Sequence, residues 1–133
     1  MATMSDDDRQ QLLGGIAFFS GCSEAQLREI SRLSEERPIA AAKELCRQDE
    51  FENEVYVIVE GDAEVVIDGS SVGKTHIGEI VGELAMLGNG RRAATLRALE
   101  PMRVLVLDAR EVDSVLAADP SSALRLDQHR GQD

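Results

Sequence analysis

Residues 77–95 read IGEIVGELAMLGNGRRAAT, a stretch that combines a Gly-Glu-Leu-Ala turn with two arginines followed by two alanines. Such a turn can open a short helix, whose first free N–H groups point toward a bound anion. Glycine permits close approach of the main chain, and an arginine can make a paired contact with phosphate oxygens. The stretch therefore predicts a small site for a phosphate-bearing ligand.

The spacing within this stretch is that of a known motif. It resembles the phosphate-binding cassette of the cyclic-nucleotide-binding domain family, the module of bacterial catabolite activators and cyclic-nucleotide-dependent kinases. The family pattern is roughly Gly-Glu-Leu/Ile-Ala, a short spacer, then Arg-Ala-Ala or Arg-Ser-Ala. The resemblance identifies the matching positions as ligand-binding: Gly82, Glu83, Leu84, Ala85, Arg92, Ala93 and Ala94.

The resemblance implies distinct roles for the two charged positions. Glu83 would accept a hydrogen bond from the ribose 2′-hydroxyl, and Arg92 would pair with the cyclic phosphate. A glutamate in a first helical turn is also favourable through the helix dipole alone, so the assignment depends on the two residues together. The chain departs from the family at Arg91, where proline is common, and at Val81, where phenylalanine is common.

Along the chain, the sequence pattern changes from helical to strand-like and back to helical. A weak helix over residues 7–14 and a capping box at 23–26 form a helical region that we expect to end at Pro38. From residue 39 to 107, short strands alternate with turns, and Asp68-Gly69 is a hairpin signal. The expected strands include residues 55–59, 63–67, 72–76 and 103–107. A second capping box at 108–111 returns the chain to helix, and Asp119-Pro120 can begin a last one.

The predicted fold is mainly β, a jelly roll (double-stranded β-helix) with N- and C-terminal α-helices. We expect a single domain over residues 1–133. Its parts are N-terminal helices over 1–37, a β jelly roll over 38–107 with the cassette at 82–94, and C-terminal helices over 108–133. Residues 18–23 and 55–61 also resemble landmarks of the family.

Composition excludes several classes of function. The chain has 133 residues, enough for one core, and a net charge of −11, which argues against non-specific DNA binding and anionic membranes. Cys22 and Cys46 form no CxxC pair or metal spacing, which favours buried thiols in a reducing cytoplasm. We expect no membrane anchor, because the longest apolar run is short and no signal sequence opens the chain.

Two apparent enzyme motifs fail on inspection. Residues 69–75, GSSVGKT, imitate a nucleoside-triphosphate loop, but that loop needs one more residue before its Gly-Lys pair and should open a helix. His76 and His129 are too few for the metal site of a jelly-roll metalloenzyme. The sequence thus predicts neither an enzyme nor a metal protein.

The predicted function is a stand-alone regulatory module that binds a cyclic nucleotide and signals to a protein partner through its C-terminal helices. The resemblance favours 3′,5′-cyclic AMP over cyclic GMP, because family members that prefer cyclic GMP often carry a hydroxyl at the position of Ala93. Residues 121–133 are too few for a DNA-reading helix-turn-helix, and we expect them to form at best a partial lid over the base. The alternatives are an interaction module that lost its ligand, or a fragment of a larger cyclic-nucleotide-regulated protein.

Overall fold

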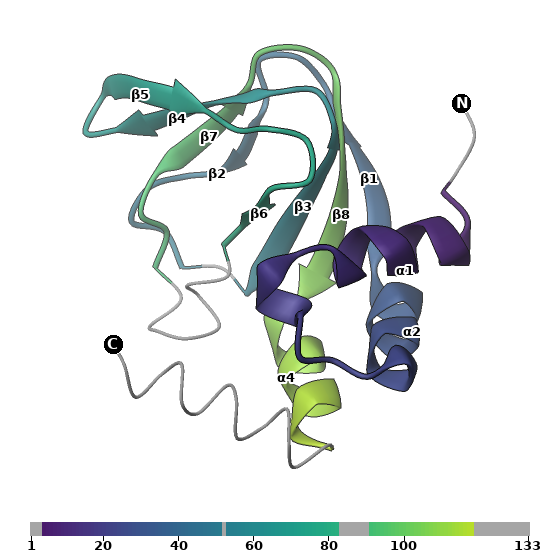
Figure 1. The fold of residues 1–133 in the computed structure, drawn as a ribbon. Helices are drawn as coiled ribbons and strands as arrows, with labels where there is room; N and C mark the ends of the chain where they lie inside the picture. The colour runs from purple at the N-terminus through teal and green to yellow at the C-terminus, as the bar shows by residue number, and fades with distance from the viewer. Residues whose placement is uncertain (1–3, 52, 83–90, 119–133) are drawn as a thin grey trace.

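The computed structural model describes residues 4–51, 53–82 and 91–118, and its helices lie together at one end of the β-sheets (Figure 1). Three short helices come first: α1 (Asp6–Gly14), η1 (Ala17–Phe19) and α2 (Glu24–Leu33). The strands follow as β1 (Glu35–Ile39), β2 (Glu44–Cys46), β3 (Glu54–Glu60), β4 (Ala63–Ile67), β5 (Ser70–Lys74), β6 (Ile80–Val81), β7 (Thr95–Ala98) and β8 (Met102–Asp108). Helix α4 (Ala109–Ala117) follows β8 directly.

The strands form two four-stranded antiparallel sheets. The strand order is β1-β8-β3-β6 in the first sheet and β2-β7-β4-β5 in the second. Neighbours in both sheets are mostly distant in sequence, as in a roll, so the predicted mainly β fold with flanking helices is confirmed. Among the described residues, no helix is both long and apolar enough to cross a membrane.

Strands β3 and β8 are buried on both faces, which explains why they read as nearly continuous apolar runs. Successive side chains of a strand point to opposite faces. On β3, Val55 and Val57 pack against the helices, whereas Tyr56 and Ile58 pack between the two sheets. The same alternation continues on β8, so β3 and β8 separate a helix-facing core from a core inside the roll.

The helix-facing core is closed by α2 and α4, and both begin at the expected caps. The Ser23 side chain accepts from the Gln26 N–H while the Gln26 side chain accepts from the Ser23 N–H, the predicted capping box. Asp108 caps α4 by accepting from the N–H groups of Arg110 and Glu111. A last helix beginning at Pro120 would lie outside the described residues.

The hairpin of β4 and β5 confirms the turn predicted at Asp68-Gly69. Both residues have positive φ, 52° and 81°, as a two-residue hairpin turn of the primed type requires. Ser70 therefore pairs with Ile67 at once, and β5 begins there rather than at residue 72. Residues 69–75, which imitate a nucleoside-triphosphate loop, thus belong to a β-hairpin.

The first strand begins earlier than the sequence indicated. Helix α2 ends at Leu33 and β1 starts at Glu35, so the helical region does not continue to Pro38. Strand β1 lies at the edge of its sheet, where a proline is tolerated because its missing N–H can face away from the ladder.

The two cysteines differ in burial: Cys46 is buried and Cys22 is half-buried.

Candidate functional site

Arg92 lies against the start of β3, with only 4% of its surface exposed. Its Nη2 group donates to the main-chain carbonyl of Glu54, and its Cζ lies 5.7 Å from the centroid of the Tyr56 ring. The main chain is fixed as well, since the Arg92 N–H donates to the carbonyl of Glu50 at 3.0 Å. The guanidinium is therefore oriented by both a carbonyl and a ring face.

Gly82 lies directly beside that guanidinium. Its φ is +91°, in the region that favours glycine, and a Cβ added there would overlap Nη1 of Arg92. The same Cβ would stand 3.1 Å from the carbonyl oxygen of Glu54. The two ends of the cassette thus meet at one point, where the absence of a side chain makes room for a cation.

Glu54 connects this point to strand β1. Its carboxylate accepts from Nη1 and Nη2 of Arg37 at 3.3 and 3.2 Å and lies 3.1 Å from the Tyr56 hydroxyl. Hydrogen bonds from Arg37 lower the pKa of the Glu54 carboxyl, and the Tyr56 hydroxyl and the charges of Arg37 and Arg92 act in the same direction. The same contact raises the pKa of Arg37. Glu54 therefore remains ionised at neutral pH.

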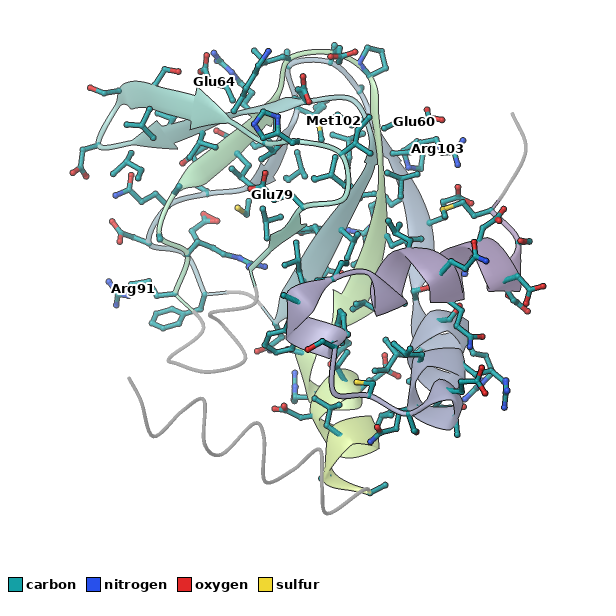
Figure 2. All side chains as sticks on the ribbon, viewed as in Figure 1. Glu60, Glu64, Glu79, Arg91, Met102 and Arg103 are labelled. Carbon is teal, nitrogen blue, oxygen red and sulfur yellow. The ribbon has the colours of Figure 1, made fainter. Side chains whose placement is uncertain are left out.

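The rim of the site is formed by the neighbouring pair Arg91 and Phe51. The two residues form an isolated antiparallel bridge, and the Arg91 Cζ lies 4.9 Å from the Phe51 ring centroid. Figure 2 shows Arg91 at the outer edge of the molecule. Arg91 is exposed, as expected for a solvated neighbour of Arg92.

The structure thus brings together Gly82 and Arg92, two of the seven residues identified as ligand-binding by the resemblance. Ala93 is exposed, whereas Ala94 is half-buried and its carbonyl lies 3.6 Å from Sγ of Cys46. Glu83, Leu84 and Ala85 lie outside the described residues. The arrangement places a buried guanidinium beside Gly82, where no side chain stands, and a guanidinium suits an anion such as a phosphate.

Sequence reasoning gave no role to Glu54, Tyr56 and Arg37. A weak signal was present, because Glu54 and Tyr56 are two residues apart and therefore share one face of a strand. Arg37 had no such signal: β1 and β3 are separated by β8 in the sheet, so the contact exists only in the folded chain.

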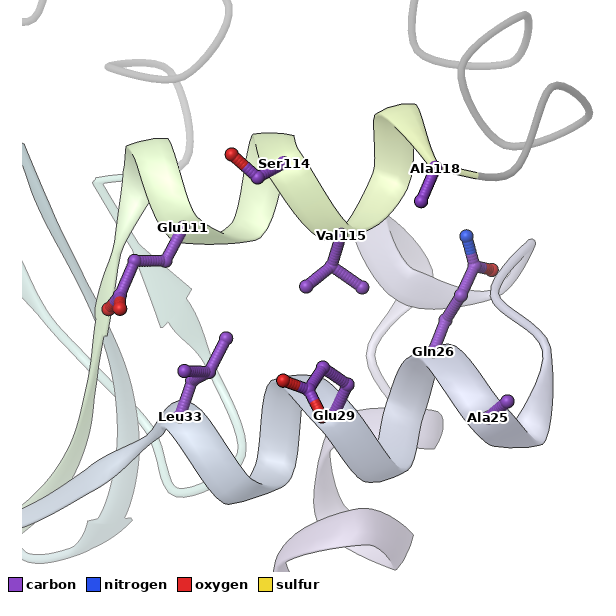
Figure 3. Close-up of a pocket in the computed structure, with 8 residues that line it drawn as sticks. All are labelled: Ala25, Gln26, Glu29, Leu33, Glu111, Ser114, Val115 and Ala118. Atoms are coloured by element: carbon purple, nitrogen blue, oxygen red, sulfur yellow. The ribbon is translucent and has the colours of Figure 1, made fainter.

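A concavity lies between α2 and α4. Its volume is about 520 Å³, and Figure 3 shows Leu33 and Val115 pointing toward one another across it. Its other lining residues are Ala25, Gln26, Glu29, Glu111, Ser114 and Ala118. Of the predicted ligand-binding residues, the four that the structure describes, Gly82, Arg92, Ala93 and Ala94, do not line it.

Comparison with known proteins identifies the family. The profile described as "Cyclic nucleotide-binding domain" matches residues 36–119. The chain is 33% identical to cGMP-dependent protein kinase, isozyme 1, of Drosophila melanogaster over 82% of its length and 15% of the kinase. It is 38% identical to the cAMP-dependent protein kinase regulatory subunit of Mycosarcoma maydis over 67% of its length and 18% of that protein.

Solved structures share the fold. The sensor domain of the transcriptional regulator DNR from Pseudomonas aeruginosa superimposes with a TM-score of 0.81 at 20% identity, covering 96% of this chain and 89% of that one. The chain spans less than a third of the length of the curated relatives named above. The matched profile extends from β1 to the end of α4 and includes both Gly82 and Arg92. The chain belongs to the cyclic nucleotide-binding domain family.

Proposed function

We propose that the site around Arg92 binds the phosphate of a 3′,5′-cyclic nucleotide, with Glu83 on the ribose 2′-hydroxyl. The observation that carries the proposal is the buried Arg92 guanidinium beside Gly82, inside the stretch whose spacing matches the family cassette. A buried cation gains more from an anionic ligand than one in water, because the local dielectric constant is lower.

The proposed ligand is cyclic AMP in preference to cyclic GMP. Ala93 follows the phosphate arginine directly and has no hydroxyl to reach the guanine amino group. The named relatives include one cGMP-dependent and one cAMP-dependent kinase protein, so the preference rests on this position.

The proposed output is a movement of the C-terminal helices that acts on a protein partner, with no catalysis by this domain. Strand β3 presents Tyr56 toward Arg92 and Val55 toward the core that contains Val112 and Leu116 of α4. A shift of β3 on ligand binding would therefore reach α4 through packed side chains. The net charge of −11 argues against nucleic acid and anionic membranes as partners. The proposed setting is the cytoplasm, because the two cysteines of the sequence form no CxxC pair and are too few for the disulfide framework of a secreted domain.

Calorimetric titration of the whole chain with cyclic AMP, cyclic GMP and adenosine tests the proposal. We expect saturable binding of cyclic AMP, weaker binding of cyclic GMP, and much weaker binding of adenosine, which lacks the phosphate. Absence of binding by both cyclic nucleotides at millimolar concentration would contradict the proposal and favour an interaction module that lost its ligand.

A further inference from the structure

We infer that Tyr56 and Glu54 are positioning residues for the Arg92 guanidinium, and that Arg37 acts on Arg92 through them. The inference deepens the proposed function and rests on it for its binding readout. It assigns a contribution to ligand affinity to three residues of β1 and β3 that lie outside the cassette.

The ring of Tyr56 supports the guanidinium from one side. The Arg92 Cζ stands 5.7 Å from the ring centroid, within the range of a cation–π contact, and both residues are buried. The Tyr56 hydroxyl lies 3.0 Å from the carbonyl of Leu45 and 3.1 Å from Oε1 of Glu54, so its single proton has an acceptor on either side. These contacts fix the plane of the ring on which Arg92 rests.

Glu54 supports the guanidinium from a second side, through its main chain. The carbonyl that accepts from Nη2 of Arg92 belongs to the residue whose carboxylate is held by Arg37. Glu54 therefore connects its ion pair with Arg37 of β1 to the phosphate arginine. Loss of the carboxylate would remove the ion pair with Arg37 and one of the two acceptors of the Tyr56 hydroxyl.

A purely structural role for Tyr56 is the competing explanation, because the residue is 2% exposed within the core between the sheets. A core residue would affect stability, and would affect ligand affinity equally whatever side chain stood at position 92. A positioning residue would lose its effect on affinity once the guanidinium is gone. A double-mutant cycle separates the two.

The cycle combines Tyr56→Leu and Glu54→Gln with Arg92→Lys, which keeps a positive charge but lacks the guanidinium fork. By calorimetry with cyclic AMP, we expect Tyr56→Leu to weaken binding about three- to tenfold and Glu54→Gln about two- to fivefold. Tyr56→Phe, which keeps the ring, should remain closer to the wild type than Tyr56→Leu. In the Arg92→Lys background these effects should largely disappear.

Glu44→Gln is the matched control. The Glu44 carboxylate also pairs with an arginine, Arg47, and its side chain is 36% exposed, against 37% for Glu54. Glu44 contacts Arg47 and pairs with Arg97 across the β2–β7 ladder, so the affinity of the Glu44→Gln variant for cyclic AMP should equal that of the wild type. Circular dichroism checks that every variant is folded, and if Tyr56→Leu does not fold, the half-exposed Glu54 decides the test.

A ligand-free readout separates this inference from the proposed function. The chain has one tyrosine and no tryptophan, so its intrinsic emission reports on Tyr56 alone. Arg92→Gln should change that emission without any nucleotide, because the cation leaves the ring face. Unchanged emission would overturn the inference even if the wild type bound no cyclic nucleotide. The inference would also be overturned if Tyr56→Leu and Glu54→Gln weakened binding equally in the wild-type and Arg92→Lys backgrounds, or did not weaken it at all.

Discussion

Substitution of Gly82 by alanine tests the geometry of the site with a single methyl group. Gly82 has φ +91°, and the added Cβ would overlap Nη1 of Arg92 and stand 3.1 Å from its Cζ. Gly78 provides the control, since its φ is +86° but a Cβ there meets nothing within 4 Å. The two substitutions share the backbone cost and differ in the contact with Arg92.

The expected magnitudes follow from these contacts. An alanine at positive φ costs about 1–2 kcal/mol of folding stability at either position. Complete loss of one partner of a shielded charge pair costs roughly 2–5 kcal/mol of binding. A displaced guanidinium keeps part of that interaction, so Gly82→Ala should weaken cyclic AMP binding by about 1.5–3 kcal/mol, or roughly ten- to a hundredfold.

Calorimetry for affinity and thermal unfolding for stability measure the two effects separately. Gly78→Ala should lower the melting temperature as Gly82→Ala does, while its affinity for cyclic AMP stays near that of the wild type. Equal affinities for the two variants would refute the close approach of Gly82 to Arg92 as the basis of the site.

Three further predictions concern selectivity, pH and nucleic acid. Ala93→Thr should improve cyclic GMP binding by about 0.5–1.5 kcal/mol; a competition assay in which the wild type already prefers cyclic GMP would contradict this. The pKa of Glu54 is lowered in the folded state, chiefly by hydrogen bonds from Arg37. The ionised carboxylate therefore stabilises the fold above its unfolded pKa of about 4.3, and this stabilisation is lost as the pH falls through the lower folded pKa. Glu54→Gln should therefore make the melting temperature fall less steeply on acidification below about pH 5. The same fall of the melting temperature with pH in the wild type and the variant would count against this prediction. Duplex DNA should not bind in a gel-shift assay at low salt, with or without nucleotide, because the net charge is −11; a salt-sensitive shift at sub-micromolar protein would show otherwise.

The parts of the fold that the sequence predicted have strong local signals. Strands β3 and β8 appear as apolar runs, the Asp68-Gly69 turn requires residues that accept positive φ, and Ser23 and Asp108 are capping residues. Strands β2 and β7 were not predicted, and β1 was assigned to the preceding helical region. The pairing partners of these strands are distant in sequence, as for Glu44 with Arg97, so no local pattern specifies them.

The candidate site likewise has a part that the sequence predicts and a part that only the folded structure shows. The spacing from Gly82 to Arg92 lies within one stretch of sequence and was recognisable there. The contacts of Arg92 with Glu54 and Tyr56 form only when β3 reaches the cassette, and Arg37 joins them across β8. Tertiary packing, rather than any local preference, brings these side chains together.

Paired calorimetric titrations of the wild type and Arg92→Ala with cyclic AMP test the central claim most directly. Removal of the guanidinium leaves the bound phosphate poorly compensated in a shielded site, so affinity should fall by roughly 2–5 kcal/mol, about thirtyfold to several thousandfold. Circular dichroism should show that the variant remains folded. The same affinity in both proteins would contradict the assignment of Arg92 as the phosphate-binding residue.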